Sequence, residues 1–142
     1  MRSIEAKEIT AAIARLCREA NYYLGEDVKA ALHKSQLTEE SVIGQEILSQ
    51  LVENCQIAAA QQMPVCQDTG LTVIFLEIGQ DLHIEGGDLN QAVQEGVRQG
   101  YQNLRKSIVA HPLKRINTGD NTPAVIHTEI VPGQQLTIRV AP

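Results

Sequence analysis

The sequence contains no tryptophan, one phenylalanine and three tyrosines, and it has no apolar run of membrane-spanning length. Its first residues include Arg2, Glu5, Lys7 and Glu8, which leave no apolar segment for a signal peptide. We therefore expect no membrane association and a cytoplasmic location. With 43% hydrophobic and 20% charged residues among 142, the composition is typical of a globular domain and not of a disordered chain.

Clusters of basic residues are also missing. The basic side chains are dispersed apart from the pairs Arg105-Lys106 and Lys114-Arg115, and the formal net charge is -5. Nucleic-acid binders concentrate positive charge against the phosphate backbone, so this pattern argues against that class of protein. We expect no nucleic-acid partner.

Cysteine is scarce, with three residues at positions 17, 55 and 66. Their number is odd and their spacing is wide, so they predict neither a disulfide framework nor a self-contained zinc site. Cys17 and Cys55 fall in the apolar stripes of expected helices, where cysteine usually packs as a small apolar residue. We expect all three to be reduced thiols.

The periodicity of apolar residues predicts helices over residues 4–20, 25–34, 38–62 and 88–105. Thr38 is the expected N-cap of the third helix, followed by Glu39 and Glu40 in its first turn, and Pro64 lies just beyond its end. Ser35 and Gln36 are expected to interrupt the second helix. Asp88 resembles an N-cap, whereas Gly96 and Gly100 weaken the fourth helix.

Strands are expected at 71–78 and 82–85, joined by the turn 79–81 as a hairpin, and at 124–131 and 135–140, joined by Pro132-Gly133. The order predicts an α+β fold, in which amino-terminal helices precede a small mixed or antiparallel sheet with a further helix. We expect one domain over residues 1–142. The last strand runs directly into Ala141-Pro142, so we expect the chain to be a piece of a longer protein.

The most reactive group lies between the third helix and the first expected strand, in the turn Pro64-Val-Cys-Gln-Asp-Thr-Gly70. A cysteine in a turn between proline and glycine is presented outward, so Cys66 is a candidate nucleophile or metal ligand. The four histidines lack metal-ligand spacing, and we assign none of them as a ligand. One thiolate cannot hold an iron–sulfur cluster, so such a site would need cysteines from outside this sequence.

Two other interpretations of these residues stay open. Asp68-Thr69-Gly70 followed by apolar residues matches the catalytic tripeptide of aspartic proteases. Those proteins are almost entirely β, whereas long helical segments precede the tripeptide here, which argues against a protease. Arg105 is by default a solvated arginine at a helix C-terminus, where the helix dipole favours a cation.

Several segments together resemble class I fumarate hydratase, over nearly the whole chain. They are Val52-Glu-Asn-Cys-Gln-Ile-Ala-Ala-Ala, the seven-residue turn 64–70, Asn103-Leu-Arg and Asn121-Thr-Pro-Ala-Val-Ile-His. The similarity covers the amino-terminal part of the α subunit in two-subunit enzymes, whose near relatives include L-tartrate dehydratase. It implies an iron–sulfur hydro-lyase that interconverts fumarate and malate, with L-tartrate as the alternative substrate.

The resemblance also implies roles for individual residues. Cys66 would be one of three cysteine ligands of a 4Fe-4S cluster, Gln67 and Arg105 would bind substrate carboxylates, and Asp68 would bind substrate and transfer protons. The other two cysteines and a glycine-rich segment lie beyond the position that matches Pro142. A β subunit or carboxy-terminal domain of the same enzyme would therefore be a required partner.

The expected consequence is that this polypeptide is inactive by itself. A different hypothesis is a non-catalytic assembly or binding domain that uses the same surface to dock the rest of the enzyme. Absence of a cluster-binding half would leave apolar surface exposed, so we also expect an oligomer.

Overall fold

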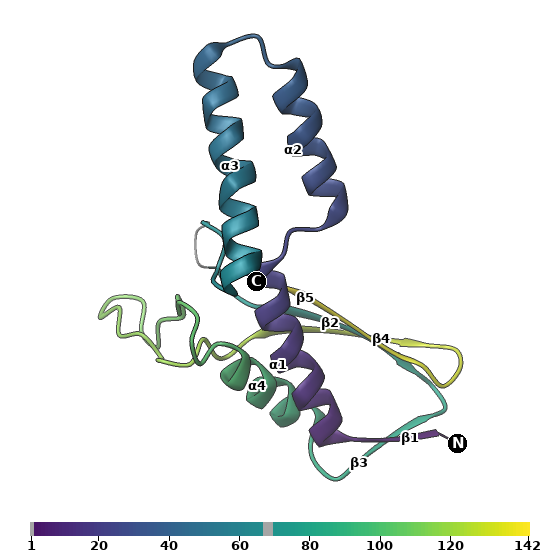
Figure 1. The fold of residues 1–142 in the computed structure, drawn as a ribbon. Coiled ribbons are helices and arrows are strands. Elements are labelled where there is room, and N and C mark those ends of the chain that lie inside the picture. The colour runs from purple at the N-terminus through teal and green to yellow at the C-terminus, as the bar shows by residue number, and fades with distance from the viewer. Residues whose placement is uncertain (1, 67–69) are drawn as a thin grey trace. The chain divides into compact units, whose positions relative to one another are not determined.

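The computed structural model describes residues 2–66 and 70–142, which form two compact units. Unit 1 comprises the described residues of Met1–Arg18 and Thr69–Pro142, and unit 2 those of Glu19–Asp68. Figure 1 shows the course of the chain through both units. Helices with small sheets of parallel and antiparallel strands confirm the predicted α+β class.

Unit 1 contains a three-stranded sheet with β2 (Val73–Gly79) at its centre. β2 pairs in parallel with β4 (Val125–Val131) and antiparallel with β5 (Leu136–Ala141), so the sheet is mixed. Alternate residues of β2 point to opposite faces. Ile74 and Leu76 are buried, whereas Phe75 is 41% exposed, so one face of the sheet carries the core and the other is open.

Two helices cover the core face, namely α1 (Ala6–Tyr22) and α4 (Leu89–Gly100) (Figure 1). Their buried apolar side chains include Ile9, Ile13, Val93 and Val97. Glycines in α4 bring the two helices close together: a Cβ atom at Gly96 would lie 2.8 Å from Ile13 Cβ, and one at Gly100 would lie 2.6 Å from Cys17 Cβ. The glycines that weaken helix propensity are therefore needed for packing.

Gly96→Val is expected to destabilise unit 1 by about 3 kcal/mol or more, because overpacking forces side chains and backbone to shift. The added Cβ would also lie 2.8 Å from the Thr10 carbonyl oxygen, which is backbone and cannot rotate away. Denaturant unfolding measures the effect, with Gln91→Val as the matched control at an exposed position of the same helix. Equal unfolding midpoints for the two variants would contradict this packing.

The amino-terminal residues differ from the prediction. Arg2–Glu5 form β1, so the helix begins at Ala6 and not at residue 4. β1 pairs in parallel with β3 (Leu82–Glu85) as a separate two-stranded sheet, and the predicted hairpin between β2 and β3 is wrong. The reason lies in the turn after β2: the N–H groups of Gln80 and Asp81 donate to the carbonyls of Val131 and Gly133, at 2.8 and 2.9 Å, and so join the β4–β5 connection.

The fourth helix begins as predicted and ends early. The Asp88 carboxylate accepts a hydrogen bond from the Gln91 backbone N–H at 2.8 Å, which confirms the N-cap. The helix ends at Gly100, and the chain then turns through Tyr101 and Leu104, whose side chains are buried. Arg105 therefore follows a turn, and its predicted place at a helix C-terminus is wrong.

Unit 2 contains a helical hairpin of α2 (Glu26–Thr38) and α3 (Val42–Gln61). The expected interruption of α2 is wrong, because Gln36 stays helical and donates to the Ser49 hydroxyl of α3 at 2.9 Å. Thr38 ends α2, and Ser41 is the N-cap of α3, its hydroxyl accepting from the Gly44 N–H. α3 ends before Pro64 as predicted. None of the described helices is long and apolar enough to cross a membrane.

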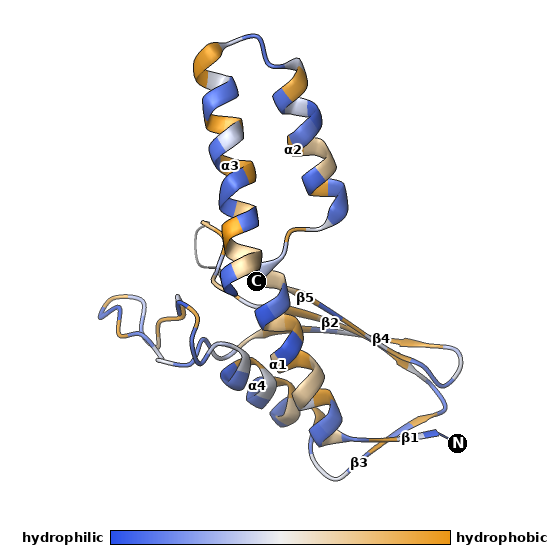
Figure 2. Ribbon diagram, viewed as in Figure 1, coloured by the Kyte–Doolittle hydropathy of each residue, from blue (hydrophilic) through white to orange (hydrophobic). Residues whose placement is uncertain are grey.

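The apolar stripe of α3 lies largely at the surface of unit 2. Val42 is 80% exposed and Ile43 is 70% exposed, and Ile47 and Leu51 are also exposed. Figure 2 shows hydrophobic stretches, coloured orange, along α3. Ala58 is the buried residue of this helix. The periodicity predicted the helix correctly, but within unit 2 few residues are available to cover its apolar side.

Candidate functional site

Cys66 lies on a short segment that leaves the end of α3. Two hydrogen bonds fix its backbone: the Val65 N–H donates to the Asn21 carbonyl, and the Cys66 N–H donates to the Asn54 side-chain oxygen, both at 2.9 Å. The Cys66 residue itself is exposed. Gln67 and Asp68, the neighbouring predicted site residues, lie outside the described residues. The structure therefore presents an accessible thiol on an anchored backbone.

The other two cysteines differ from Cys66 in their surroundings. Cys17 is fully buried, and burial, only partly offset by Arg18, raises the pKa of its thiol to about 12. It stays protonated at neutral pH and packs as a core residue. Cys55 is half-buried and lines a groove of about 240 Å³ between α2 and α3. None of the three forms a disulfide within the described chain.

Arg105 lies in unit 1 on the segment after α4, and its residue is exposed. Its neighbours are anchored, because Leu104 is buried and the Ser107 hydroxyl donates to the Gly70 carbonyl at 2.7 Å. No carboxylate among residues 2–66 and 70–142 forms an ion pair with Arg105. The segment that carries Arg105 thus contacts Gly70, the last residue of the turn 64–70. Within residues 2–66 and 70–142 the Arg105 guanidinium has no ion-pair partner and is available to bind an anion.

Asp120, which the sequence analysis did not single out, accepts hydrogen bonds on the loop before β4. Arg98 Nε donates to its carboxylate at 3.0 Å, and the Thr122 hydroxyl and N–H donate at 2.7 and 3.0 Å. Burial raises the pKa of Asp120, but the hydrogen bonds from Thr122 and Arg98 outweigh it and lower the pKa to about 2. Asp120 therefore orders the loop that leads into the sheet.

Asp120→Asn is expected to lower the free energy of unfolding at neutral pH by about 1 kcal/mol, a modest value because the pair is partly solvated. A carboxylate whose folded-state pKa is depressed stabilises the protein above its unfolded pKa near 3.8. The difference in free energy of unfolding between the native protein and the variant should therefore narrow as the pH falls from about 4 to about 2. Urea unfolding across this range measures it, with Asp81→Asn as the exposed control. A constant gap would contradict the assignment.

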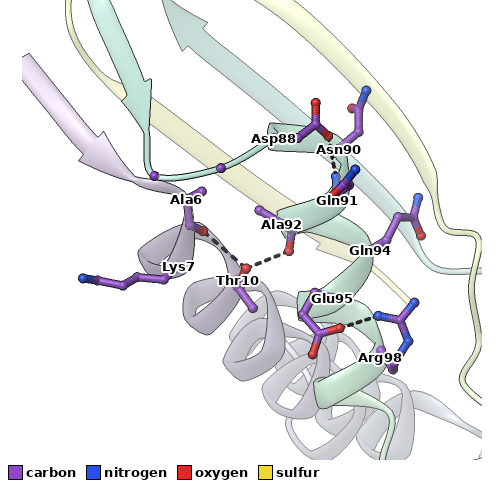
Figure 3. Close-up of a pocket in the computed structure, with 12 residues that line it drawn as sticks. Ala6, Lys7, Thr10, Asp88, Asn90, Gln91, Ala92, Gln94, Glu95 and Arg98 are labelled. Atoms are coloured by element: carbon purple, nitrogen blue, oxygen red, sulfur yellow. Dashed lines mark hydrogen bonds and ion pairs between the residues drawn. The ribbon is translucent and has the colours of Figure 1, made fainter.

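A polar groove of about 670 Å³ lies elsewhere in unit 1, between the first turns of α1 and the length of α4 (Figure 3). Some of its polar groups are paired with one another: the Thr10 hydroxyl donates to the Ala92 carbonyl at 2.9 Å, and Arg98 pairs with Glu95. None of the predicted site residues lines it. We therefore interpret the groove as a feature of the packing of α1 against α4 and assign it no function.

An iron–sulfur cluster is the group that the resemblance implies, and its cysteine ligands are thiolates. The described residues contain no group of three histidine, cysteine, aspartate or glutamate side chains that could hold a metal. The exposed Cys66, with its anchored backbone, could supply one cysteine ligand of such a cluster. A site with three protein ligands would therefore need groups from outside residues 2–66 and 70–142.

Sequence reasoning missed the polar residues that anchor the two site segments, namely Asn54, Ser107 and Asn121. Asn54 lies within a helix and Ser107 in the irregular segment after α4, and neither position has a local motif. Asn121 belongs to a run of turn residues, Asn-Thr-Gly-Asp-Asn-Thr-Pro, which was the available signal. Their partners are distant in sequence, so the structure was needed to identify them.

Comparison with known proteins identifies a family and several relatives of the chain. A sequence model of the family described as fumarate hydratase (fumerase) matches residues 10–142. The chain is 38% identical over 125 residues to the "Putative L(+)-tartrate dehydratase subunit alpha" of Methanocaldococcus jannaschii, covering 83% of this chain and 44% of that protein. It is 31% identical over 140 residues to the anaerobic class I fumarate hydratase of Escherichia coli, covering 93% and 25%.

A further relative is the aerobic class I fumarate hydratase of Escherichia coli, 42% identical over 91 residues, which cover 61% of this chain and 16% of that protein. The chain spans less than half the length of each of these relatives. The family match extends through the Cys66 turn, the Arg105 segment and all three strands of the mixed sheet. The chain belongs to the fumarate hydratase (fumerase) family.

Proposed function

We propose that this chain provides one part of the active site of an iron–sulfur hydro-lyase that reversibly hydrates fumarate to malate, and that it is inactive alone. The observation that carries the proposal is the exposed Cys66, its backbone held by Asn54, inside the seven-residue turn of a chain that belongs to this family. An accessible thiol on a fixed backbone suits a metal ligand better than a core position.

Each residue has a role that its chemistry suits. Cys66 would hold a 4Fe-4S cluster, which when bound supplies a Lewis acid for the substrate hydroxyl and carboxylate. Arg105 and Gln67 would bind the two carboxylates of the substrate. Asp68 would bind substrate and carry a proton to or from the carbon adjacent to the one that bears the hydroxyl. The exposed guanidinium of Arg105, with no ion-pair partner in residues 2–66 and 70–142, supports its role.

The proposal requires a partner, because one thiolate does not hold a cluster. We propose that a β subunit or a carboxy-terminal domain of the same enzyme supplies the remaining ligands and carboxylate-binding groups. One relative is itself named as an alpha subunit, which supports a divided enzyme. The absence of disulfides in the described chain suits a reducing compartment, and the proposed location is the cytoplasm.

The substrate is tested by assembling the chain anaerobically with the remaining enzyme parts, iron and sulfide. Fumarate, L-malate and L-tartrate are then offered separately. We expect fumarate and malate to interconvert. Dehydration of tartrate alone would instead establish the tartrate dehydratase α subunit. No turnover of any of the three diacids in an assembled complex would contradict a catalytic role.

A non-catalytic assembly domain is the second candidate, and the exposed apolar residues of α3 favour it. The exposed residues Val42, Ile43 and Ile47 lie in the first two turns of that helix. Apolar patches of this kind often mark protein–protein contacts. This role is compatible with catalysis in the complete enzyme and would persist without it.

Ile43→Lys combined with Ile47→Lys is expected to weaken association of the chain at least tenfold, because two buried cations would be left unpaired in an apolar contact. Light scattering of the chain and of its assembly with the partner measures this. Glu46→Lys, between the two positions on the same helix, is the matched control for added charge. Unchanged association of the double variant would exclude this surface as an interface.

A further inference from the structure

Two fully buried polar side chains, Asn121 and Thr72, lie beneath the segment that carries Arg105 in unit 1. Both are 0% exposed. Burying a polar group costs free energy unless its hydrogen bonds are satisfied. The Asn121 side-chain nitrogen donates to the Thr72 hydroxyl at 3.2 Å, so each supplies a partner for the other.

The side-chain oxygen of Asn121 is directed to a different segment. It accepts hydrogen bonds from the backbone N–H groups of Ser107 and Ile108, at 2.8 and 3.4 Å. Asn121 has a φ angle of 60°, in the left-handed region that asparagine tolerates better than most residues. One side chain thereby joins the loop before β4, the residue that precedes β2 and the irregular segment after α4.

Ser107 extends this connection to the turn 64–70. Its hydroxyl donates to the Gly70 carbonyl at 2.7 Å, while its N–H is held by Asn121. On the other side of Arg105, Leu104 is buried. The exposed arginine therefore sits between two anchored neighbours, and one of them is bonded to the residue that closes the predicted site turn.

We propose that Ser107 and Asn121 are positioning residues, which fix the backbone of the Arg105 segment against Gly70 within unit 1. The inference rests on the proposed function of Arg105 as a carboxylate-binding group. Neither positioning residue is assigned a contact with substrate. They act by holding the backbone from which Arg105 extends, because small misplacements of a binding group are costly.

Ser107→Ala is the test variant, since it removes one hydroxyl and leaves the buried Asn121 network in place. In the assembled enzyme we expect KM for fumarate to rise about five- to tenfold with kcat little changed, as for lost substrate binding. Ser107→Thr, which keeps the hydroxyl, should restore KM. The effect should also disappear when Arg105 is already alanine, because Ser107 is proposed to act through that side chain.

Thr10→Val is the matched control in the same unit. The Thr10 hydroxyl also donates to a distant backbone carbonyl, that of Ala92 at 2.9 Å, but it lies between α1 and α4. We expect this variant to lower the melting temperature and to leave KM unchanged. The comparison separates a general loss of stability from a loss of positioning.

The outcomes distinguish this inference from the proposed function. If Ser107→Ala lowers only the melting temperature, as Thr10→Val does, while Arg105→Ala raises KM, the positioning role is overturned and the proposed function stands. If Arg105→Ala changes neither KM nor kcat, the proposed role of Arg105 fails, and the positioning role fails with it. A KM effect of Ser107→Ala that persists undiminished in the Arg105→Ala background would also overturn the inference.

Discussion

Cys66→Ser in the assembled enzyme is expected to abolish cluster binding and to lower fumarate hydration by a factor on the order of 10³ or more. Serine has nearly the same shape and lacks the thiolate that iron requires, so loss would report ligation and not packing. Because Cys66 is exposed, its replacement by serine should not disturb folding, so a folding defect would not account for the loss of the cluster. Iron content, visible absorption of the cluster and the initial rate measure the effect.

Cys55→Ser is the matched control for Cys66. It makes the same chemical change in the same unit, at a half-buried residue between α2 and α3. We expect this variant to keep its iron and its rate. Full iron content and turnover in Cys66→Ser would remove Cys66 from the site, and equal losses in both variants would indicate a general sensitivity to serine.

Arg105→Ala is expected to raise KM for fumarate about 100-fold, because a bidentate pair of charge-assisted hydrogen bonds to a carboxylate is lost. Arg105→Lys should fall between alanine and arginine, since lysine keeps the charge but not the planar fork. Both variants should fold normally, because the residue is exposed. Steady-state kinetics with the assembled enzyme provide the values.

Lys106→Ala tests whether any nearby cation would serve. The Lys106 ammonium donates to the Gln102 carbonyl at 2.8 Å and is thereby held on its own turn. We expect a KM within about twofold of the native value, as for most surface substitutions. A large rise in KM for Lys106→Ala, together with an unchanged KM for Arg105→Ala, would contradict the role of Arg105 and assign carboxylate binding to Lys106.

Local sequence patterns predicted the elements whose signals are local. The period of apolar residues gave α3 and its end before Pro64, and Asp88 was confirmed as the N-cap of α4. Errors arose where pairing is distant in sequence. β3 is adjacent to β2 along the chain, yet it pairs with β1, about eighty positions away, because the turn after β2 bonds to the β4–β5 connection.

The same contrast between local signals and distant pairs explains which site residues could be predicted from the sequence. Cys66 could be predicted because its turn contains proline and glycine next to polar residues, all within seven positions. The residues that anchor the site segments act over sequence separations of 12, 37 and 49 positions, in the pairs Asn54 with Cys66, Ser107 with Gly70, and Asn121 with Thr72. No local pattern encodes such pairs, and only the folded chain brings their polar atoms together.

The central claim is that this chain supplies one indispensable part of a divided hydro-lyase site. The most direct test reconstitutes the remaining enzyme parts anaerobically with iron and sulfide, with and without this chain, and records iron content and fumarate hydration together. We predict an intact cluster and turnover only when the chain is present. The same iron content and rate in its absence would contradict the claim.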